Sequence, residues 1–323
     1  MRVLTPAQRE QFEMEGYVVV DGVLDSVEDL APVIADCEQV LDGLAEALFR
    51  EGRIQSTYSG LDSGGRLIQV CIESGQNFYQ YFDISLPQTG VRHDTPINVS
   101  PAMFRLLTSP RLLDLAEDLI GPDIYCNPVQ HVRLKLPKRA IATTGPYSGL
   151  VSQTPWHQDN GVILPEGDES RMLTVWVPVN QATVENGCLQ VIPNSHRSGL
   201  IPHCPVEQGL TISDSLLPAK APVPLPMQPG SVLLMTSRTV HSSLKNVTES
   251  EVRISLDLRY QPVGKPTGRP VFPGFVVRST ACPSAVMSDP GAWASLWLAA
   301  RARLAEESDP TFNRWKTGVG VCA

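Results

Sequence analysis

The chain from Ile124 onward constrains the fold most, because it consists of short apolar segments of strand length separated by proline and glycine. These segments occupy residues 124–126, 129–136, 173–179, 188–192, 231–235 and 252–260. Asn186-Gly187 is a hairpin turn signal, which predicts that the strand around Trp176 pairs with the strand at Cys188. Many short strands with such turns predict a sandwich or barrel, and a double-sheet jelly roll is one solution.

Alternation within one of these segments predicts which of its faces is buried. The odd-numbered positions from Leu173 to Val179 are aliphatic, whereas Thr174 and Trp176 lie between them. Side chains two residues apart share one face of a strand, so we expect a half-buried strand here.

Helical patterns flank this β-rich part. Thr5-Pro6-Ala7-Gln8 forms a capping box, which predicts a helix to about Glu15, and a short strand is expected from Tyr17. Further helices with one apolar face are predicted over about 26–50, 109–121 and 290–307. Residues 51–100 are polar and irregular in pattern. The aromatic residues of that segment either line a substrate mouth or anchor it, and we favour anchoring: Phe78, Tyr79, Tyr81 and Phe82.

The chain shows no internal repeat, low-complexity tract or clear linker, which predicts one domain over residues 1–323. Within it we expect a helical N-terminal part over about 1–122 and a jelly-roll core over about 123–262. A C-terminal extension with a helix follows over about 263–323.

Composition narrows the class of partner. The net charge is −8 and no basic stripe interleaved with aromatic residues occurs, which argues against nucleic-acid binding. No apolar run approaches 18 residues, so no membrane association is expected. The seven cysteines form no CxxC pair, which argues against a disulfide framework or a zinc ribbon and favours the cytoplasm. We expect a monomer or a homodimer.

One short motif carries the chemistry. In Trp156-His157-Gln158-Asp159, a histidine and a carboxylate two residues apart can point to the same side of an extended segment. An imidazole and a carboxylate suit ferrous iron, and a second histidine would complete a 2-His-1-carboxylate triad with open positions. Alternatively, the motif is a polar loop with a surface ion pair.

The remaining histidines supply the candidates for the third ligand: His93, His131, His196, His203 and His241. His241 is favoured because it follows an apolar strand and precedes Ser243 and, on the next strand, Arg253. A guanidinium beside a hydroxyl is what the distal carboxylate of a dicarboxylate needs, while the other end of that molecule binds iron. We expect His93 to be exposed and His196 to be structural.

With these motifs in this order, the sequence resembles the phytanoyl-CoA dioxygenase family of Fe(II)/2-oxoglutarate-dependent oxygenases. The resemblance is carried by residues 156–160, 185–196, 229–231, 241–243 and 253–260, and it is strong over roughly 125–262. It implies a mainly β fold with flanking helices, namely a cupin-like double-stranded β-helix. It also implies Fe(2+), 2-oxoglutarate and O2, with ascorbate as an accessory reductant.

The resemblance also implies roles for individual residues. His157, Asp159 and His241 would hold the iron and act as the catalytic centre. Arg253 and Ser243 would bind the C5 carboxylate of 2-oxoglutarate, with Arg259 as an alternative to Arg253. Two further residues match family positions near the C1 carboxylate and keto group, namely Lys135 and Trp176. From the residues alone, Lys135 could equally lie on a solvated strand edge and Trp176 could be a core residue.

The activity implied is hydroxylation of a small-molecule substrate, natural-product or lipid-like, with release of succinate and CO2. Desaturation, cyclisation and epimerisation use the same site and remain open. The carboxylate at Asp159 disfavours halogenation, because related halogenases have a small residue there. Two other classes remain open as well: a catalytically silent jelly-roll binding protein and a cupin-type dioxygenase without a co-substrate. We expect the substrate pocket to draw on residues 51–100, 147–153 and 200–225, the last of them as a lid.

Overall fold

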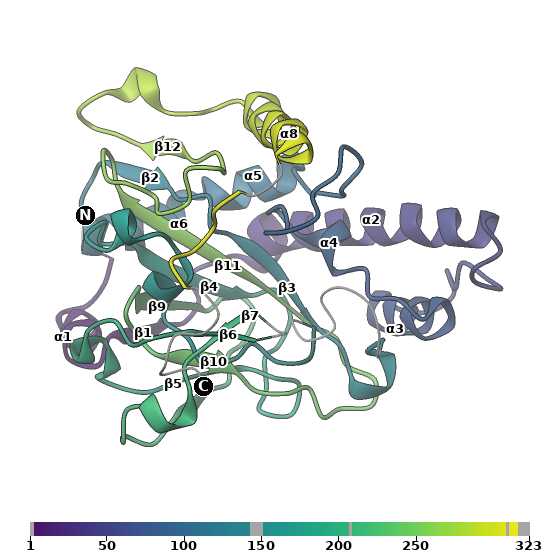
Figure 1. The fold of residues 1–323 in the computed structure, drawn as a ribbon, viewed down its shortest axis with the longest axis horizontal. Coiled ribbons are helices and arrows are strands. Elements are labelled where there is room, and N and C mark those ends of the chain that lie inside the picture. Colours follow the sequence, from purple (N-terminus) through teal and green to yellow (C-terminus); the bar gives the residue numbers. More distant parts are fainter. Residues whose placement is uncertain (1–2, 143–150, 207–208, 308–309, 316–323) are drawn as a thin grey trace.

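A seven-stranded antiparallel sheet is central to the computed structural model, which describes residues 3–142, 151–206, 209–307 and 310–315 (Figure 1). Its strands follow the order β1-β9-β4-β11-β2-β12, and β3 also pairs with the long strand β11. Their bounds are β1 (Tyr17–Val20), β2 (Ile124–Cys126), β3 (His131–Lys135), β4 (Leu173–Pro178), β9 (Val232–Thr236), β11 (Arg253–Pro262) and β12 (Phe275–Arg278).

A second, three-stranded sheet faces the first. It consists of β10 (His241–Ser243), β5 (Leu189–Val191) and β8 (Val223–Leu225), in that order. Apolar residues of the two sheets pack together between them, including Trp176 and Leu233 from the first sheet and Val191 and Leu225 from the second. Two facing antiparallel sheets are what the predicted jelly roll requires. A separate hairpin pairs β6 (Cys204–Val206) with β7 (Gly209–Thr211).

Helices cover the other face of the large sheet. They are α1 (Pro6–Glu15), α2 (Ala31–Arg50), α3 (Ser63–Ser74), α4 (Tyr79–Phe82), α5 (Pro101–Leu107), α6 (Pro110–Ile120) and α8 (Pro290–Glu306), with a π-helical turn at Ser26–Leu30 before α2. Apolar residues on their inner faces form one core with the sheet's aliphatic side chains. The capping box at Thr5 is present. Figure 1 shows α3 and α4 beside α2. Among the described residues, no helix is long and apolar enough to span a bilayer.

The prediction that residues 51–100 are irregular is wrong in part, because this segment contains α3 and α4. Gly64 and Gly65 obscure the start of α3, which is set by the Asp62 side chain accepting a hydrogen bond from the Gly65 N–H at 2.7 Å. The anchoring role of the aromatic residues is confirmed for three of them, since Phe78, Tyr79 and Phe82 are buried. Tyr81 is exposed.

The predicted hairpin at Asn186-Gly187 is also wrong. β4 lies in the large sheet, whereas β5 pairs with β10 and β8 in the small one. The Asn186 side chain instead organises a loop between the sheets, accepting from the Thr183 N–H at 2.8 Å and donating to the Gln181 carbonyl at 2.9 Å. Gly187 has a positive φ of 91° and lies against the Leu244 carbonyl, which explains the need for glycine. The chain passes here from the large sheet to the small one and does not form a hairpin.

Strand β4 is buried on both faces, which corrects the half-buried expectation. Its residues Leu173, Val175 and Val177 pack on the helices, whereas Thr174 and Trp176 point between the sheets. β11 follows the same rule, with Leu256 and Leu258 in the helical core. The intervening positions of β11 are polar, and they reach the interior that the two sheets enclose: Arg253, Ser255, Asp257 and Arg259.

Cysteine usage matches the expectation only in part. Five cysteines are free, namely Cys37, Cys71, Cys126, Cys188 and Cys282. Cys204, at the start of β6, is disulfide-bonded, which the sequence did not lead us to expect.

Candidate active site

Three buried side chains converge between the two sheets: His157, Asp159 and His241. His157 and His241 form an isolated β-bridge, in which each backbone N–H donates to the other's carbonyl at 3.0 Å. Asp159 begins the short 3-10 helix Asp159–Val162 just beyond this bridge. One ligand atom from each of the three residues lies within 4.8 Å of the others, so the cluster could hold one metal ion. The convergence expected from the sequence is therefore present.

Both histidines present the nitrogen that a metal needs. Nδ1 of His157 lies 2.8 Å from the Pro155 carbonyl, and Nδ1 of His241 lies 2.9 Å from the Thr239 carbonyl. A carbonyl oxygen only accepts, so each Nδ1 carries a proton, and Nε2 is the nitrogen that can bind a metal. Burial and the neighbouring His241 lower the pKa of His157 well below its ordinary value, which keeps that imidazole neutral. The donor set of two imidazoles and a carboxylate fits ferrous iron.

The Asp159 carboxylate is fixed by hydrogen bonds to both of its oxygens. Oδ1 accepts from Nη2 of Arg259 at 2.6 Å, and Oδ2 accepts from the hydroxyl of Thr174 on β4. Burial alone would raise the pKa of Asp159, but Arg259 and the two histidines lower it below its ordinary range. Asp159 is therefore an anion with a fixed orientation, as a metal-binding carboxylate should be.

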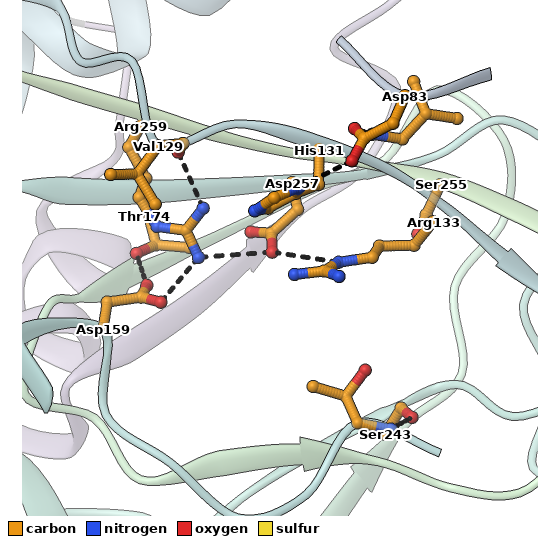
Figure 2. Close-up of polar contacts among 12 residues, drawn as sticks. Asp83, Val129, His131, Arg133, Asp159, Thr174, Ser243, Ser255, Asp257 and Arg259 are labelled. Atoms are coloured by element: carbon orange, nitrogen blue, oxygen red, sulfur yellow. Dashed lines mark hydrogen bonds and ion pairs between the residues drawn. The ribbon is translucent and has the colours of Figure 1, made fainter. Parts of the chain in front are cut away.

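Arg259 belongs to a longer chain of charges on the inner face of the large sheet. Figure 2 shows the contacts running from Asp159 through Arg259 and Asp257 to Arg133. Arg259 lies 3.2 Å from Asp257 and donates through Nη1 to the Val129 carbonyl at 2.8 Å. Asp257 lies 3.8 Å from Nε of Arg133 on β3. The Arg259 guanidinium is thus paired with two carboxylates of the protein itself.

A small pocket adjoins the two histidines. Its lining residues come from both sheets: Arg133, Thr154, His157, Trp176, Leu189, His241, Arg253 and Asp257. The segments expected to shape the substrate pocket contribute no lining residue among the described ones. Residues 147–150 and 207–208 of those segments lie outside the described residues.

Arg253 is a buried cation that lines the pocket together with the two histidines. Nη1 donates to the Ser255 hydroxyl at 2.5 Å and Nη2 to the Gly187 carbonyl at 2.9 Å, whereas Nε has no partner. No carboxylate among the described residues lies within ion-pair distance of this guanidinium, and burial lowers the pKa of Arg253 to about 9. A buried guanidinium without a counter-ion is unfavourable, so the site fits an anionic ligand that enters the pocket.

Three further residues predicted from the sequence also lie close to this pocket. The Ser243 hydroxyl is buried and accepts from the Thr154 N–H at 2.8 Å. Trp176 lines the pocket and belongs to the core between the sheets, with the Arg253 guanidinium 5.5 Å from its ring centre. Lys135 is fully buried, so a solvated strand edge is wrong. Its Nζ donates to the Thr154 hydroxyl at 3.1 Å, and burial together with Arg253 lowers the pKa of Lys135 well below its usual range.

The other histidines lie apart from the cluster. His131 contacts Asp83 at 2.9 Å, and His196 contacts the Glu13 carbonyl at 3.2 Å, which supports its structural role. His203 accepts from the Gln158 N–H at 2.8 Å beneath the site, and His93 is exposed as expected.

Sequence reasoning missed two residues behind the cluster, Thr174 and Asp257, and the pocket-lining Arg133. The pattern that could have revealed them is a polar residue at every second position of strands that are otherwise apolar.

The family model for phytanoyl-CoA dioxygenase (PhyH) matches residues 12–255. The chain belongs to this family. It is accordingly a non-haem iron, 2-oxoglutarate-dependent oxygenase. The phytanoyl-CoA dioxygenase domain-containing protein 1 of Rattus norvegicus is 26% identical over 77% of this chain and 87% of its own length. The 1-deoxypentalenic acid 11-beta-hydroxylase of Streptomyces arenae is 28% identical over 80% and 81%.

Solved structures confirm the double-stranded β-helix. The non-heme monooxygenase ThoJ in its apo form has a TM-score of 0.57 at 20% identity, covering 91% of this chain and 95% of its own. The epimerase SnoN, solved with Fe3+, alpha ketoglutarate and nogalamycin RO, has a TM-score of 0.52 at 22% identity, covering 88% and 91%. At these identities the likeness establishes the fold.

Replacing Arg259 by methionine should weaken iron binding about 10- to 100-fold, the usual effect of losing a residue that orients a metal ligand. The variant loses the charge and one of the two hydrogen bonds that fix Asp159. Metal affinity is measured by competition with a chromogenic chelator. Arg238→Met, at a partly exposed position paired with Glu169, serves as the charge-matched control. A folded Arg259→Met protein with unchanged iron affinity would contradict this role.

Proposed function

We propose that this chain hydroxylates a small natural-product or lipid-like molecule, using iron held by His157, Asp159 and His241. One observation carries the proposal: the buried His–Asp–His cluster adjoins a pocket that is also lined by Arg253, a guanidinium with no carboxylate partner among the described residues. A metal-binding group and a carboxylate-binding group that face one small pocket suit 2-oxoglutarate, which has a chelating end and a distal carboxylate.

The residues of the pocket divide the work of holding this co-substrate. Arg253 pairs with the C5 carboxylate, and the Ser243 hydroxyl, which already accepts from Thr154, donates its proton to the same group. Trp176 forms a wall of the pocket and Lys135 supplies a buried amine on the adjoining strand. Arg259 is not the anchor in this assignment, because its guanidinium is bound to Asp159 and Asp257.

The chemistry follows from this arrangement. Iron, when bound, supplies the oxidising chemistry: O2 and 2-oxoglutarate are consumed, one oxygen atom enters succinate as CO2 leaves, and the other enters the substrate. The protein's part is to position and to exclude water. His157 and His241 offer Nε2 to the metal, Thr174 and Arg259 orient Asp159, and the buried pocket keeps the reacting groups away from bulk solvent.

The names of related proteins support a small-molecule substrate. One curated relative is a hydroxylase of 1-deoxypentalenic acid, and two proteins of the same fold are an epimerase and a carbocyclase from nogalamycin biosynthesis. Hydroxylation is the outcome we propose, with desaturation, cyclisation or epimerisation as alternatives at the same site. A cupin-type dioxygenase without co-substrate would leave the Arg253 guanidinium without a role.

The test is succinate formation from 2-oxoglutarate with Fe(II) and ascorbate, with and without a panel of natural products. We expect slow formation of succinate by the enzyme alone and faster formation with a substrate. Calorimetric titration of 2-oxoglutarate into the Mn(II)-loaded protein gives a readout that does not depend on turnover. Absence of both 2-oxoglutarate binding and succinate formation would leave the silent binding protein as the better description.

A further inference from the structure

Arg133 is a second guanidinium in the pocket, and the proposed function gives it no role. It lies on β3, opposite Ser255 of β11, and its side chain is only 14% exposed. It lines the same pocket as His157, His241 and Arg253. Figure 2 shows its guanidinium group directed from β3 into the space between the sheets, with Ser243 on the opposite side. A buried charge aimed into a binding pocket is a candidate for ligand recognition.

Most of the Arg133 donors have no partner among the described residues. A guanidinium has five N–H donors, yet within the described part of the chain Arg133 makes one hydrogen bond, from Nη1 to the Tyr79 hydroxyl at 3.3 Å. Its ion pair with Asp257 is long, at 3.8 Å. Arg259, by contrast, donates to Asp159, Asp257 and the Val129 carbonyl. Arg133 therefore keeps donors available to a molecule in the pocket.

The carboxylates near Arg133 are engaged elsewhere. Asp257 lies closer to Arg259, at 3.2 Å. Asp83 accepts from the Val132 N–H at 3.0 Å and the Tyr79 hydroxyl at 2.6 Å, and it contacts His131 at 2.9 Å. Asp83 reaches Arg133 only through Tyr79. These contacts hold the guanidinium in place without saturating it, which is how a preorganised ligand-binding group is arranged.

We propose that Arg133 binds a carboxylate of the primary substrate, so the substrate class is small-molecule carboxylic acids. The assignment rests on the proposed function, in which Arg253 pairs with the C5 carboxylate of 2-oxoglutarate and the C1 carboxylate binds the metal. That leaves Arg133 for a different molecule. A planar guanidinium with adjacent free N–H groups matches a carboxylate in charge and in shape.

The first test needs no variant. A library of small carboxylic acids, each paired with its methyl ester, is titrated against the Mn(II)- and 2-oxoglutarate-loaded protein, with thermal stabilisation and calorimetry as readouts. We expect the acids that bind to do so at least about tenfold more tightly than their esters, as for hydrogen bonds to a buried charge. The proposal is overturned if no acid binds more tightly than its ester.

The second test replaces Arg133 by methionine. We expect this variant to lose the preference for acid over ester while its affinity for 2-oxoglutarate stays within about threefold of wild type, because the C5 carboxylate keeps Arg253. Arg133→Lys should retain part of the preference, and Arg92→Met, which removes an exposed arginine, should retain all of it. A fall in 2-oxoglutarate affinity with the acid preference intact would assign Arg133 to the C1 carboxylate and overturn the proposal. Failure of wild type to bind 2-oxoglutarate would instead refute the proposed function.

Discussion

Replacing His157 or Asp159 by alanine should abolish succinate formation, by about a thousandfold or more, because two ligands hold the metal weakly and in the wrong geometry. The three donor groups lie within 4.8 Å of one another and are buried, so solvent cannot readily substitute for a missing side chain. Activity is measured as succinate released, and iron content by metal analysis after gel filtration. Chelation of the wild-type protein should give the same loss, restored by Fe(II).

The controls separate loss of the metal from loss of the fold. Asp159→Asn retains the shape of the side chain and an acceptor for Arg259, so it should fold while binding iron poorly. His93→Ala alters an exposed histidine that contacts Glu306 and should remain fully active. Retained activity in both His157→Ala and Asp159→Ala would exclude the assignment of these residues as iron ligands.

The sequence predicted the triad because the residues next to each member in the chain distinguish it from the other histidines and carboxylates. His157 and Asp159 are two residues apart, and His241 lies between an apolar strand and the serine and arginine that follow. The structure adds the reason they meet, which is the β-bridge between His157 and His241. A bridge between segments so distant in the sequence leaves no local pattern, so it could be inferred only from the family resemblance.

The supporting residues escaped prediction for a related reason. Thr174 on β4 and Arg259 on β11 are directly opposite in the sheet register, and both reach Asp159. Sheet register is set by pairing across the whole sheet, so neither residue alone signals its contact with a metal ligand. The failed hairpin at Asn186-Gly187 has the same origin. The local turn signal is genuine, but β5 pairs within the other sheet.

Replacing Arg253 by methionine should raise the Kd for 2-oxoglutarate by about 30-fold to several thousandfold, the equivalent of about 2–5 kcal/mol for removing one partner of a buried charge pair. The C5 carboxylate would then lie in a buried pocket with the Ser243 hydroxyl but without a counter-ion. Calorimetric titration into the Mn(II)-loaded protein measures this directly. Arg253→Lys should be intermediate, because an ammonium restores the charge but not the planar pair of donors.

Arg253 and Arg259 together give a sharper test than either alone, because they lie on the same face of β11 and are equally buried. If Arg253 binds 2-oxoglutarate, Arg253→Met should weaken 2-oxoglutarate binding and leave metal affinity within about threefold. If Arg259 orients Asp159, Arg259→Met should weaken metal binding more than 2-oxoglutarate binding. Loss of the same binding property in both variants would mean that β11 had been disrupted as a whole. Loss of 2-oxoglutarate binding in Arg253→Met and of metal binding in Arg259→Met would assign each guanidinium to its own partner. Both can act in one site because side chains alternate along a strand, which places these two on the same face.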